Sequence, residues 1–388
     1  MTATIIERIK SEEKAEIHTE FEKTEKPLDD VLLKTGIGTD FTYKHEIVWI
    51  NAILLMTLNI FGLWGLLRLI TGKNYLKTFL WGFFVAYFGT EGVTIGAHRL
   101  FTHKSFKAKP ILRAILILGQ TVAGQNSVYT WCRDHRLHHR YTDTDGDPHN
   151  SKRGFFFSHM GWLIMKKHPL VMKLGKNIDM SDLKADRMIM FQRKYFFPLY
   201  FIFAFLIPVW IPIAYFNETW LNSLLSCYFL RYTLSLHGTW LVNSAAHLYG
   251  TRPYDKYLQP VESWFVSFIS LGEGWHNYHH AFPWDYKAAE LTMHFNLSAT
   301  FIRFFEKIGW AYDLKSVTPD MVTNRILRTG DGTHYELGDE ESKKAVTANG
   351  ILHPLNPSYN VIYKAPEIKL KPEGLPLFHE KDVLKLEK

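Results

Sequence analysis

Long apolar stretches alternate with polar segments along this chain of 388 residues. Four of them, at about 47–67, 76–97, 195–215 and 220–242, are each close to the ~20 apolar residues that an α-helix needs to cross a bilayer. Short polar segments separate the first from the second and the third from the fourth, which predicts two helical hairpins. A fifth apolar run, 111–123, predicts a buried or interfacial helix. We therefore expect an all-α integral membrane protein with four transmembrane helices in two hairpins, capped by a helical domain.

The distribution of charge predicts the orientation of these spans. The segment between the second and third spans is rich in Lys and Arg, whereas only Asn217, Glu218 and Thr219 join the third span to the fourth. Because basic loops stay on the cytosolic side, we expect the large segment and both termini in the cytosol. Three basic residues in the first short loop oppose this assignment and are outnumbered.

Composition divides the chain into three parts. Residues 1–45 form a polar cytosolic tail without the apolar core of a cleavable signal peptide, so the first span is expected to act as the targeting signal. Residues 46–315 form the membrane domain, and residues 316–388 a polar cytosolic tail that is expected to be partly disordered. Two cysteines, Cys132 and Cys227, are too few for a disulfide framework.

The histidines are the residues that indicate most clearly what chemistry this chain performs. They read H-R-L-F-T-H, H-R-L-H-H and H-N-Y-H-H, and the residues are His98, His103, His135, His138, His139, His276, His279 and His280, with His247 isolated. The spacing H-x-x-H-H places three imidazoles on one helical face. A lone histidine such as His45 or His334 is more often a core or surface residue, but two copies of this spacing favour a metal site. Nine imidazoles are too many for one mononuclear site, so we expect two metal ions.

The first motif poses a geometric question. His98 and His103 are five residues apart, which is about 140° around an α-helix. Either the helix ends between them, or the two side chains bind different metals. The expected topology places all three motifs on one side of the membrane, as a shared site requires.

The motifs and their surroundings resemble the membrane fatty acyl-CoA desaturases of the stearoyl-CoA Δ9 type. The similarity runs from about residue 41 to 332 and includes the segments 94–103, 131–139, 147–150, 153–162, 240–247, 252–255, 272–280 and 329–332. The run Asn243-Ser244-Ala245-Ala246-His247 makes it more specific than three histidine motifs alone.

The resemblance implies a diiron enzyme of the endoplasmic reticulum membrane. Such an enzyme uses O2 and two electrons to insert a cis double bond, expected at the Δ9 position, into a saturated fatty acyl-CoA. The nine histidines above would be catalytic and bind two iron ions, and Asn243 would join them directly or through water. Asn243 and His247 are four residues apart, so one helical face can carry both. A set of neutral imidazoles leaves the metals electron-poor, which suits hydrogen abstraction from an unactivated methylene.

The resemblance also implies a substrate site. The CoA end would meet Asn126, Arg133, Asp134, Lys166 and Lys167, and the residues that shape a bent acyl tunnel would be Trp131, Thr239 and Trp240. Basic residues suit CoA phosphates, and aromatic residues suit an acyl chain. For Lys166 and Lys167 a second interpretation stays open, because basic residues that face anionic lipid headgroups need no ligand.

The residues that depart from the usual family pattern are Glu91, Phe101, Thr102, His237 and Gly238, and Arg231 is a second charged residue within a span. A carboxyl within a span is costly and is a functional-site hypothesis by default. Glu91 either helps to set the acyl chain length or is a protonated carboxyl bonded to a backbone carbonyl. Arg231 is expected to extend toward the far interface rather than pair with Glu91. His237 and Gly238 border the expected tunnel, so substrate length and double-bond position stay open.

The electrons must come from a partner. The chain has no His-Pro-Gly-Gly haem signature, so a separate cytochrome b5 with its NADH-dependent reductase is expected. The other expected partners are fatty acyl-CoA, O2 and the lipid bilayer, and no nucleic acid. Two further functions are alternatives: a lipid or sterol hydroxylase on the same histidine scaffold, and a non-catalytic membrane protein that binds or transports metal. The His247 motif favours desaturation, and histidines at the ends of the spans oppose transport.

Overall fold

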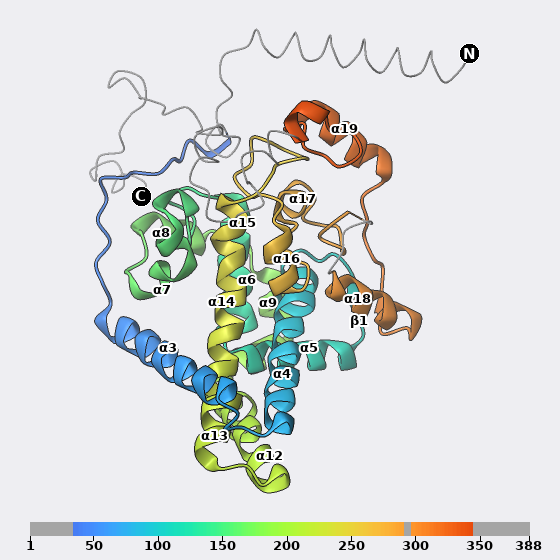
Figure 1. The fold of residues 1–388 in the computed structure, drawn as a ribbon. Coiled ribbons are helices and arrows are strands. Elements are labelled where there is room, and N and C mark those ends of the chain that lie inside the picture. Colours follow the sequence, from blue (N-terminus) through green and yellow to red (C-terminus); the bar gives the residue numbers. More distant parts are fainter. Residues whose placement is uncertain (1–33, 291–295, 344–388) are drawn as a thin grey trace.

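The computed structural model describes residues 34–290 and 296–343. Four long helical rods form its lower part, and shorter helices surround their upper ends (Figure 1). The first rod is α3 (Trp49–Ile70), and the second is α4 (Leu76–Glu91), which continues into the π-helix η1 (Gly92–Thr102). The third and fourth rods each combine three segments: α11 (Phe196–Tyr200), η4 (Phe201–Leu206) and α12 (Ile207–Phe216), then α13 (Trp220–Leu224), η5 (Leu225–Leu230) and α14 (Arg231–Asn243). The four rods coincide with the four apolar stretches of the sequence.

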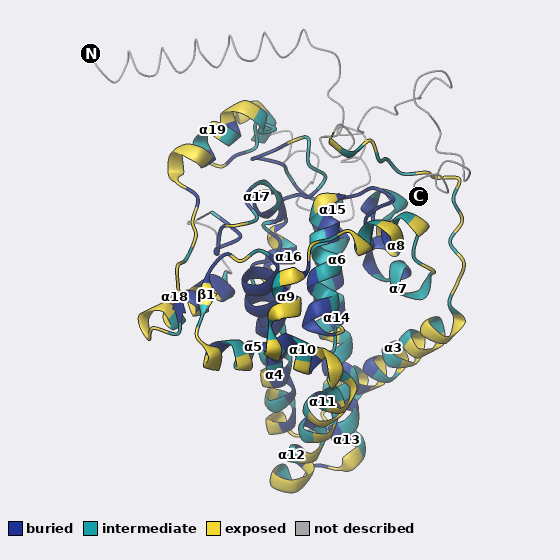
Figure 2. Cartoon of the chain, turned by 180° about the vertical axis from the view of Figure 1, so that it is seen from behind, coloured by how far each residue is buried: buried dark blue, intermediate teal, exposed yellow. Residues whose placement is uncertain are grey.

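The outer surface of the rods is apolar. Helix α3 and the rod 196–216 are by themselves long and apolar enough to cross a membrane. Leu54 and Leu63 of α3 are exposed, as are Phe197 and Trp210 of the third rod. Figure 2 shows exposed positions along the lower part of the molecule. Exposed apolar surface of this extent fits contact with lipid better than contact with water.

Close backbone contacts hold the rods together. A Cβ atom at Gly65 of α3 would lie 2.6 Å from the carbonyl oxygen of Leu225 in the fourth rod. The second rod crosses α5 (Pro110–Ala123) in the same way, because a Cβ at Gly92 would lie 2.1 Å from the backbone nitrogen of Gln120. Small residues allow helices to approach this closely. Helix α5 itself is the short helix expected for the fifth apolar run, with one face buried.

The upper part contains the remaining helices and a small sheet. Strand β1 (Lys107–Ala108) pairs antiparallel with β2 (Ala311–Tyr312). The helices are α6 (Val128–Arg140), η2 (Ser151–Arg153), η3 (Phe157–Gly161), α7 (Trp162–Ile164), α8 (Pro169–Lys176), α9 (Ser181–Ala185), α10 (Arg187–Lys194), α15 (Ala245–Leu248), α16 (Trp264–Ser270), α17 (His276–Ala281), α18 (Leu297–Lys307) and α19 (Pro319–Thr329). The described chain is mostly helical, as the sequence predicts.

Chain segments beyond the expected membrane domain belong to the same packed body. Val322 and Ile326 of α19 lie in one apolar cluster with Tyr254 and Tyr278. The packed chain therefore continues past residue 315, where a polar tail is expected to begin. Residues 1–33 and 344–388 of the two expected tails lie outside the described residues.

Arg231 is buried between three helices, which corrects one expectation. Its side chain is 3% exposed, and the guanidinium donates hydrogen bonds to the carbonyl oxygens of Cys227, Val122 and Ala204 at 2.9, 3.1 and 2.9 Å. The prediction that Arg231 extends toward the far interface is wrong. The guanidinium N–H groups bond to carbonyl oxygens inside the protein, so the side chain does not need polar partners at the membrane surface.

Candidate metal centre

The π-helix η1 answers the question that the first histidine motif poses. Helix η1 ends at Thr102, one residue before His103, and the backbone N–H of His103 still bonds to the carbonyl of His98 at 3.1 Å. This i to i+5 pattern is that of a π-helix, in which a residue five positions along lies close to the same side. Both side chains therefore reach the same group of histidines, and of the two alternatives the structure agrees with the first, that the helix ends between them.

The nine histidines converge in two groups. Within each group the candidate ligand atoms lie within 4.8 Å of one another, and the groups are His98, His103, His135, His139 and His279, then His138, His247, His276 and His280. Helices α6 and α17 each contribute to both groups: His135 and His139 face one, and His138 faces the other. The H-x-x-H-H spacing thus places two adjacent metal positions across one pair of short helices. Five plus four ligands fit the expectation of two metal ions.

Distances between Nε2 atoms test whether a metal ion fits. In the first group these distances are 2.9 Å for His98–His279, 3.0 Å for His139–His279 and 3.1 Å for His103–His135. In the second group His276–His280 measures 3.2 Å. Two imidazole nitrogens bound at right angles to one metal at about 2.1 Å lie about 3 Å apart. The Nε2 atom of His247 is buried without a partner among the described residues, as expected for a ligand atom. The donor set therefore fits two metal ions.

Burial favours the neutral form of six of these side chains. Burial, with neighbouring imidazoles as the next cause, lowers the pKa well below its usual range for His103, His135, His139, His276, His279 and His280. A neutral imidazole offers a lone pair on one nitrogen, which is the form that binds metal. The site is thus electrostatically prepared for a cation.

Three buried carboxylates fix the orientation of the imidazoles. His138 Nδ1 lies 2.7 Å from Asp147, His247 Nδ1 lies 2.7 Å from Asp143, and His98 Nδ1 lies 2.8 Å from Glu273. A carboxylate that accepts the Nδ1 proton leaves Nε2 free for the metal and makes it more basic. These carboxylates are not among the site residues predicted from the sequence. Their only signal is position, close to the second and third histidine motifs.

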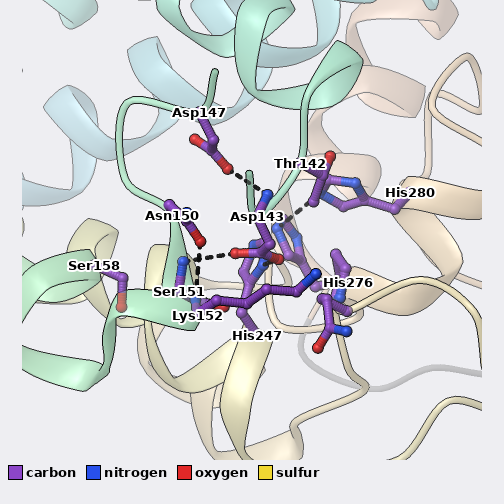
Figure 3. Close-up of polar contacts among 12 residues, drawn as sticks. Thr142, Asp143, Asp147, Asn150, Ser151, Lys152, Ser158, His247, His276 and His280 are labelled. Carbon is purple, nitrogen blue, oxygen red and sulfur yellow. Dashed lines mark hydrogen bonds and ion pairs between the residues drawn. The ribbon is translucent and has the colours of Figure 1, made fainter. Parts of the chain in front are cut away.

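The loop that carries two of these carboxylates is tightly bonded. Figure 3 shows Asp143 between Asp147 and Ser151. The backbone N–H of Asp143 donates to Asp147 at 2.8 Å, and the N–H of Ser151 donates to the Asp143 carboxylate at 2.6 Å. Asp143 has a φ of 55°, in the left-handed region that few residues other than glycine adopt. The loop thus holds a strained residue so that its carboxylate faces His247.

A cavity of about 100 Å³ adjoins the metal centre. Its wall includes Trp131, Thr239 and Asn243 together with His98, His135, His138 and His276. Of the residues expected to shape an acyl tunnel, Trp131 and Thr239 are thus at the cavity. Trp240 is not part of its wall: the indole is 3% exposed and its ring meets the edges of His159 and His237.

The residues expected at the CoA end do not all lie together. Asp134 accepts from Arg133 at 2.6 Å and from Lys167 at 2.7 Å. Lys166 instead pairs with Glu46 at the surface. Asn126 lies at the turn before α6, with a φ of 68°. The structure therefore brings Arg133, Asp134 and Lys167 together but leaves Lys166 apart.

Glu91 is buried between the second rod and α18. One carboxyl oxygen accepts hydrogen bonds from Ser298 at 2.8 Å and from Thr94 at 3.1 Å. Its partners are hydroxyl groups, and not the backbone carbonyl considered above. Thr90 and Thr94 line the cavity, whereas Glu91 lies behind them.

Comparison with known proteins places the chain in a family. Residues 74–301 match the family model "Fatty acid desaturase". The chain is 51% identical over 297 residues to an acyl-CoA Delta-9 desaturase of Acheta domesticus, covering 76% of this chain and 82% of that protein. It is 48% identical to the stearoyl-CoA desaturase of Homo sapiens, over 75% of this chain and 80% of that one. A (11Z)-hexadec-11-enoyl-CoA conjugase of Bombyx mori is also 48% identical, over 75% of this chain and 88% of that protein. The chain therefore belongs to the fatty acid desaturase family and is an oxidoreductase.

Proposed function

We propose that this protein is an acyl-CoA desaturase that introduces a cis double bond, at the Δ9 position, into a saturated fatty acyl-CoA. The balanced reaction takes one CH2–CH2 pair, O2, two electrons and two protons to one CH=CH pair and two waters. The observation that carries this proposal is the cavity beside the two histidine groups, with His98, His135, His138 and His276 in its wall. An acyl chain in this cavity would present its methylenes to both groups.

Two iron ions fit the chemistry of the ligands. The five-histidine group would hold one, and the four-histidine group with Asn243 the other. When bound, the irons supply the oxidant that removes hydrogen from an unactivated methylene. The protein's own part is to hold the imidazoles in place through Asp143, Asp147 and Glu273, and to keep water from the reacting carbons.

The substrate would be held at its CoA end and beside the metals. Arg133 and Lys167, which both pair with Asp134, would bind the phosphates of CoA. Trp131 and Thr239 shape the cavity where the chain passes the metals. Gln125 links these two residues, because its amide donates to Thr239 at 2.8 Å and accepts from the Trp131 indole at 3.3 Å. The distance from the CoA end to the metals would then decide which carbons react.

We further infer four membrane spans, with both termini and the metal centre on the cytosolic side of the endoplasmic reticulum membrane. The four rods and their apolar surface support this topology. Separate cytochrome b5 and its NADH-dependent reductase would supply the electrons from the cytosol. Opposite charges steer such partners together, and a basic cytosolic surface suits an acidic one.

Expression in a desaturase-deficient yeast tests the proposal. Gas chromatography of fatty acid derivatives should show a new monounsaturated acid with its double bond at Δ9, and iron analysis should give two irons per chain. An oxygenated product without an alkene would instead identify a hydroxylase. A double bond at another position would overturn only the regiochemistry.

A further inference from the structure

Four polar side chains form a relay between α3 and the end of α14. The relay consists of Asn59, His237, His159 and Ser244. His237 Nε2 lies 2.8 Å from Asn59 Oδ1, His159 Nε2 lies 2.9 Å from His237 Nδ1, and His159 Nδ1 lies 2.9 Å from Ser244 Oγ. None of the four lines the cavity beside the metal centre. The histidine motifs do not account for His159 and His237.

The donors in this relay run in one direction when both rings are neutral. The amide N–H of Asn59 is used on the carbonyl of Leu55 at 2.8 Å, so Asn59 Oδ1 accepts from His237 Nε2. His237 Nδ1 then accepts from His159 Nε2, and His159 Nδ1 is left as an acceptor 2.9 Å from Ser244 Oγ, whose one proton the carbonyl of Trp240 also attracts at 2.7 Å. Each imidazole thus accepts on one edge and donates on the other, which an apolar side chain cannot do.

The relay ends where the helix breaks. Ser244 has φ −110° and ψ −72°, and it separates α14, which ends at Asn243, from α15, which holds His247. Its backbone N–H and its hydroxyl both lie within reach of the carbonyl of Trp240, at 3.0 and 2.7 Å. Serine side chains that compete for the carbonyl four residues back bend helices. His159 contacts the same hydroxyl from outside the helix and competes with the Trp240 carbonyl for its proton, so the break in the helix is exposed to the position of His159.

Both rings are held firmly. His159 is 8% exposed and stacks on Phe155 with ring centroids 5.0 Å apart. The indole of Trp240 meets His237 edge-on at 5.1 Å. A fixed relay can transmit the position of α3 and η3 to Ser244, because its members have little freedom to turn aside.

We propose that His159 and His237 are positioning residues for the metal centre, acting through Ser244 on Asn243 and His247. The inference rests on the proposed two-iron centre. Asn243 directly precedes the break, and His247 follows it by three residues, so a change in its direction moves both relative to His138, His276 and His280. The five-histidine group takes no ligand from α14 or α15 and should not respond.

Iron spectroscopy of purified variants tests this proposal. His159→Leu and His237→Leu interrupt the relay, His237→Asn keeps a group that can accept and donate in series, and Thr233→Val is the matched control. Thr233 donates to the carbonyl of Leu58 and so joins the same two helices without contact with Ser244. We expect the leucine variants to bind iron about 10-fold more weakly at one of the two sites, as outer partners of metal ligands typically do. One of two Mössbauer signals should weaken, kcat should fall, and KM for acyl-CoA should stay unchanged.

The conservative and control variants decide the outcome. His237→Asn should restore much of the iron signal, and Thr233→Val should match the unmodified protein. Leucine variants whose iron signals and kcat equal those of Thr233→Val would overturn the positioning role. If a leucine variant is not recovered in folded form, Asn59→Leu tests the same relay from its far end, with the same expected and contrary results. An unmodified protein without iron would instead overturn the proposed function itself.

Discussion

The Nδ1 atom of His247 lies 2.7 Å from a carboxylate oxygen of Asp143, although 104 residues separate them in the sequence. This contact ties the loop after α6 to the short helix α15, and so links the second histidine motif to the isolated histidine. The carboxylate also holds its own loop together through Ser151. The buried side chain of Asp143 thus positions His247 and also closes the loop to which Asp143 belongs.

Replacing Asp143 by Asn should weaken metal binding at the four-histidine group. The amide can still accept a hydrogen bond, but it lacks the negative charge that makes His247 more basic. Losses of such partners typically cost about 10- to 100-fold in metal affinity. Iron titration of the metal-free protein measures the effect.

Asp145→Asn is the matched control for this change. Asp145 lies in the same loop but pairs with Arg153 at 2.6 Å, away from the histidine ligands. Equal iron affinity in the two variants would show that the loop, and not the Asp143 charge, determines binding.

Glu262 should make the protein more stable in mild acid than at pH 8. The side chain is buried, and burial raises its pKa to about 8. The unfolded chain releases this proton near the ordinary value of 4.5, whereas the folded chain keeps it. Stability from this group is therefore fully present below pH 4.5 and is lost as the pH rises toward about 8.

Glu262→Gln tests this pH dependence. The amide keeps a hydrogen-bond acceptor for the backbone N–H of Tyr278, which Glu262 accepts at 2.8 Å. Thermal unfolding of the variant should equal that of the parent near pH 5 and exceed it near pH 8. A difference that does not depend on pH would mean that Glu262 does not hold its proton in the folded state.

Arg231→Met should destabilise the protein strongly. Methionine fills similar volume but leaves the carbonyls of Cys227, Val122 and Ala204 without these donors. A buried polar group left unsatisfied costs about 1–3 kcal/mol. Arg68→Met is a suitable control. Arg68 is half-buried and bonds to Asn222 near the start of the fourth rod. Thermal unfolding in detergent should separate the two variants, and equal losses would contradict the role given to Arg231.

Some of these features could be predicted from the sequence, and others could not. Four apolar stretches of about 20 residues indicate four rods, because length and hydropathy alone decide them. The spacing of His135, His138 and His139 predicts a shared helical face for the same local reason. By contrast, the burial of Arg231 depends on carbonyls from three different helices, which no local sequence pattern indicates. The joint use of His98 and His103 depends on a π-helix, whose wider turn invalidates α-helical arithmetic. Asp143 and Glu273 were missed because their role exists only across long-range contacts.

Glu91→Leu should change which acyl chains are accepted rather than abolish activity. Glu91 accepts from Thr94 and Ser298, and Thr94 lines the cavity. Without the carboxyl, the Thr94 hydroxyl keeps only Ser298 Oγ, 3.0 Å away, as a partner and is freer to turn toward the acyl chain, and the contact between the second rod and α18 loosens. Differences of one methylene in an apolar pocket change specificity by roughly 10-fold or more. We therefore expect a shift of roughly that size in the ratio of kcat/KM for palmitoyl-CoA and stearoyl-CoA. Glu91→Gln retains the hydrogen bonds and should keep the parent ratio. An unchanged ratio in Glu91→Leu would show that this part of the cavity wall does not determine which acyl chain is accepted.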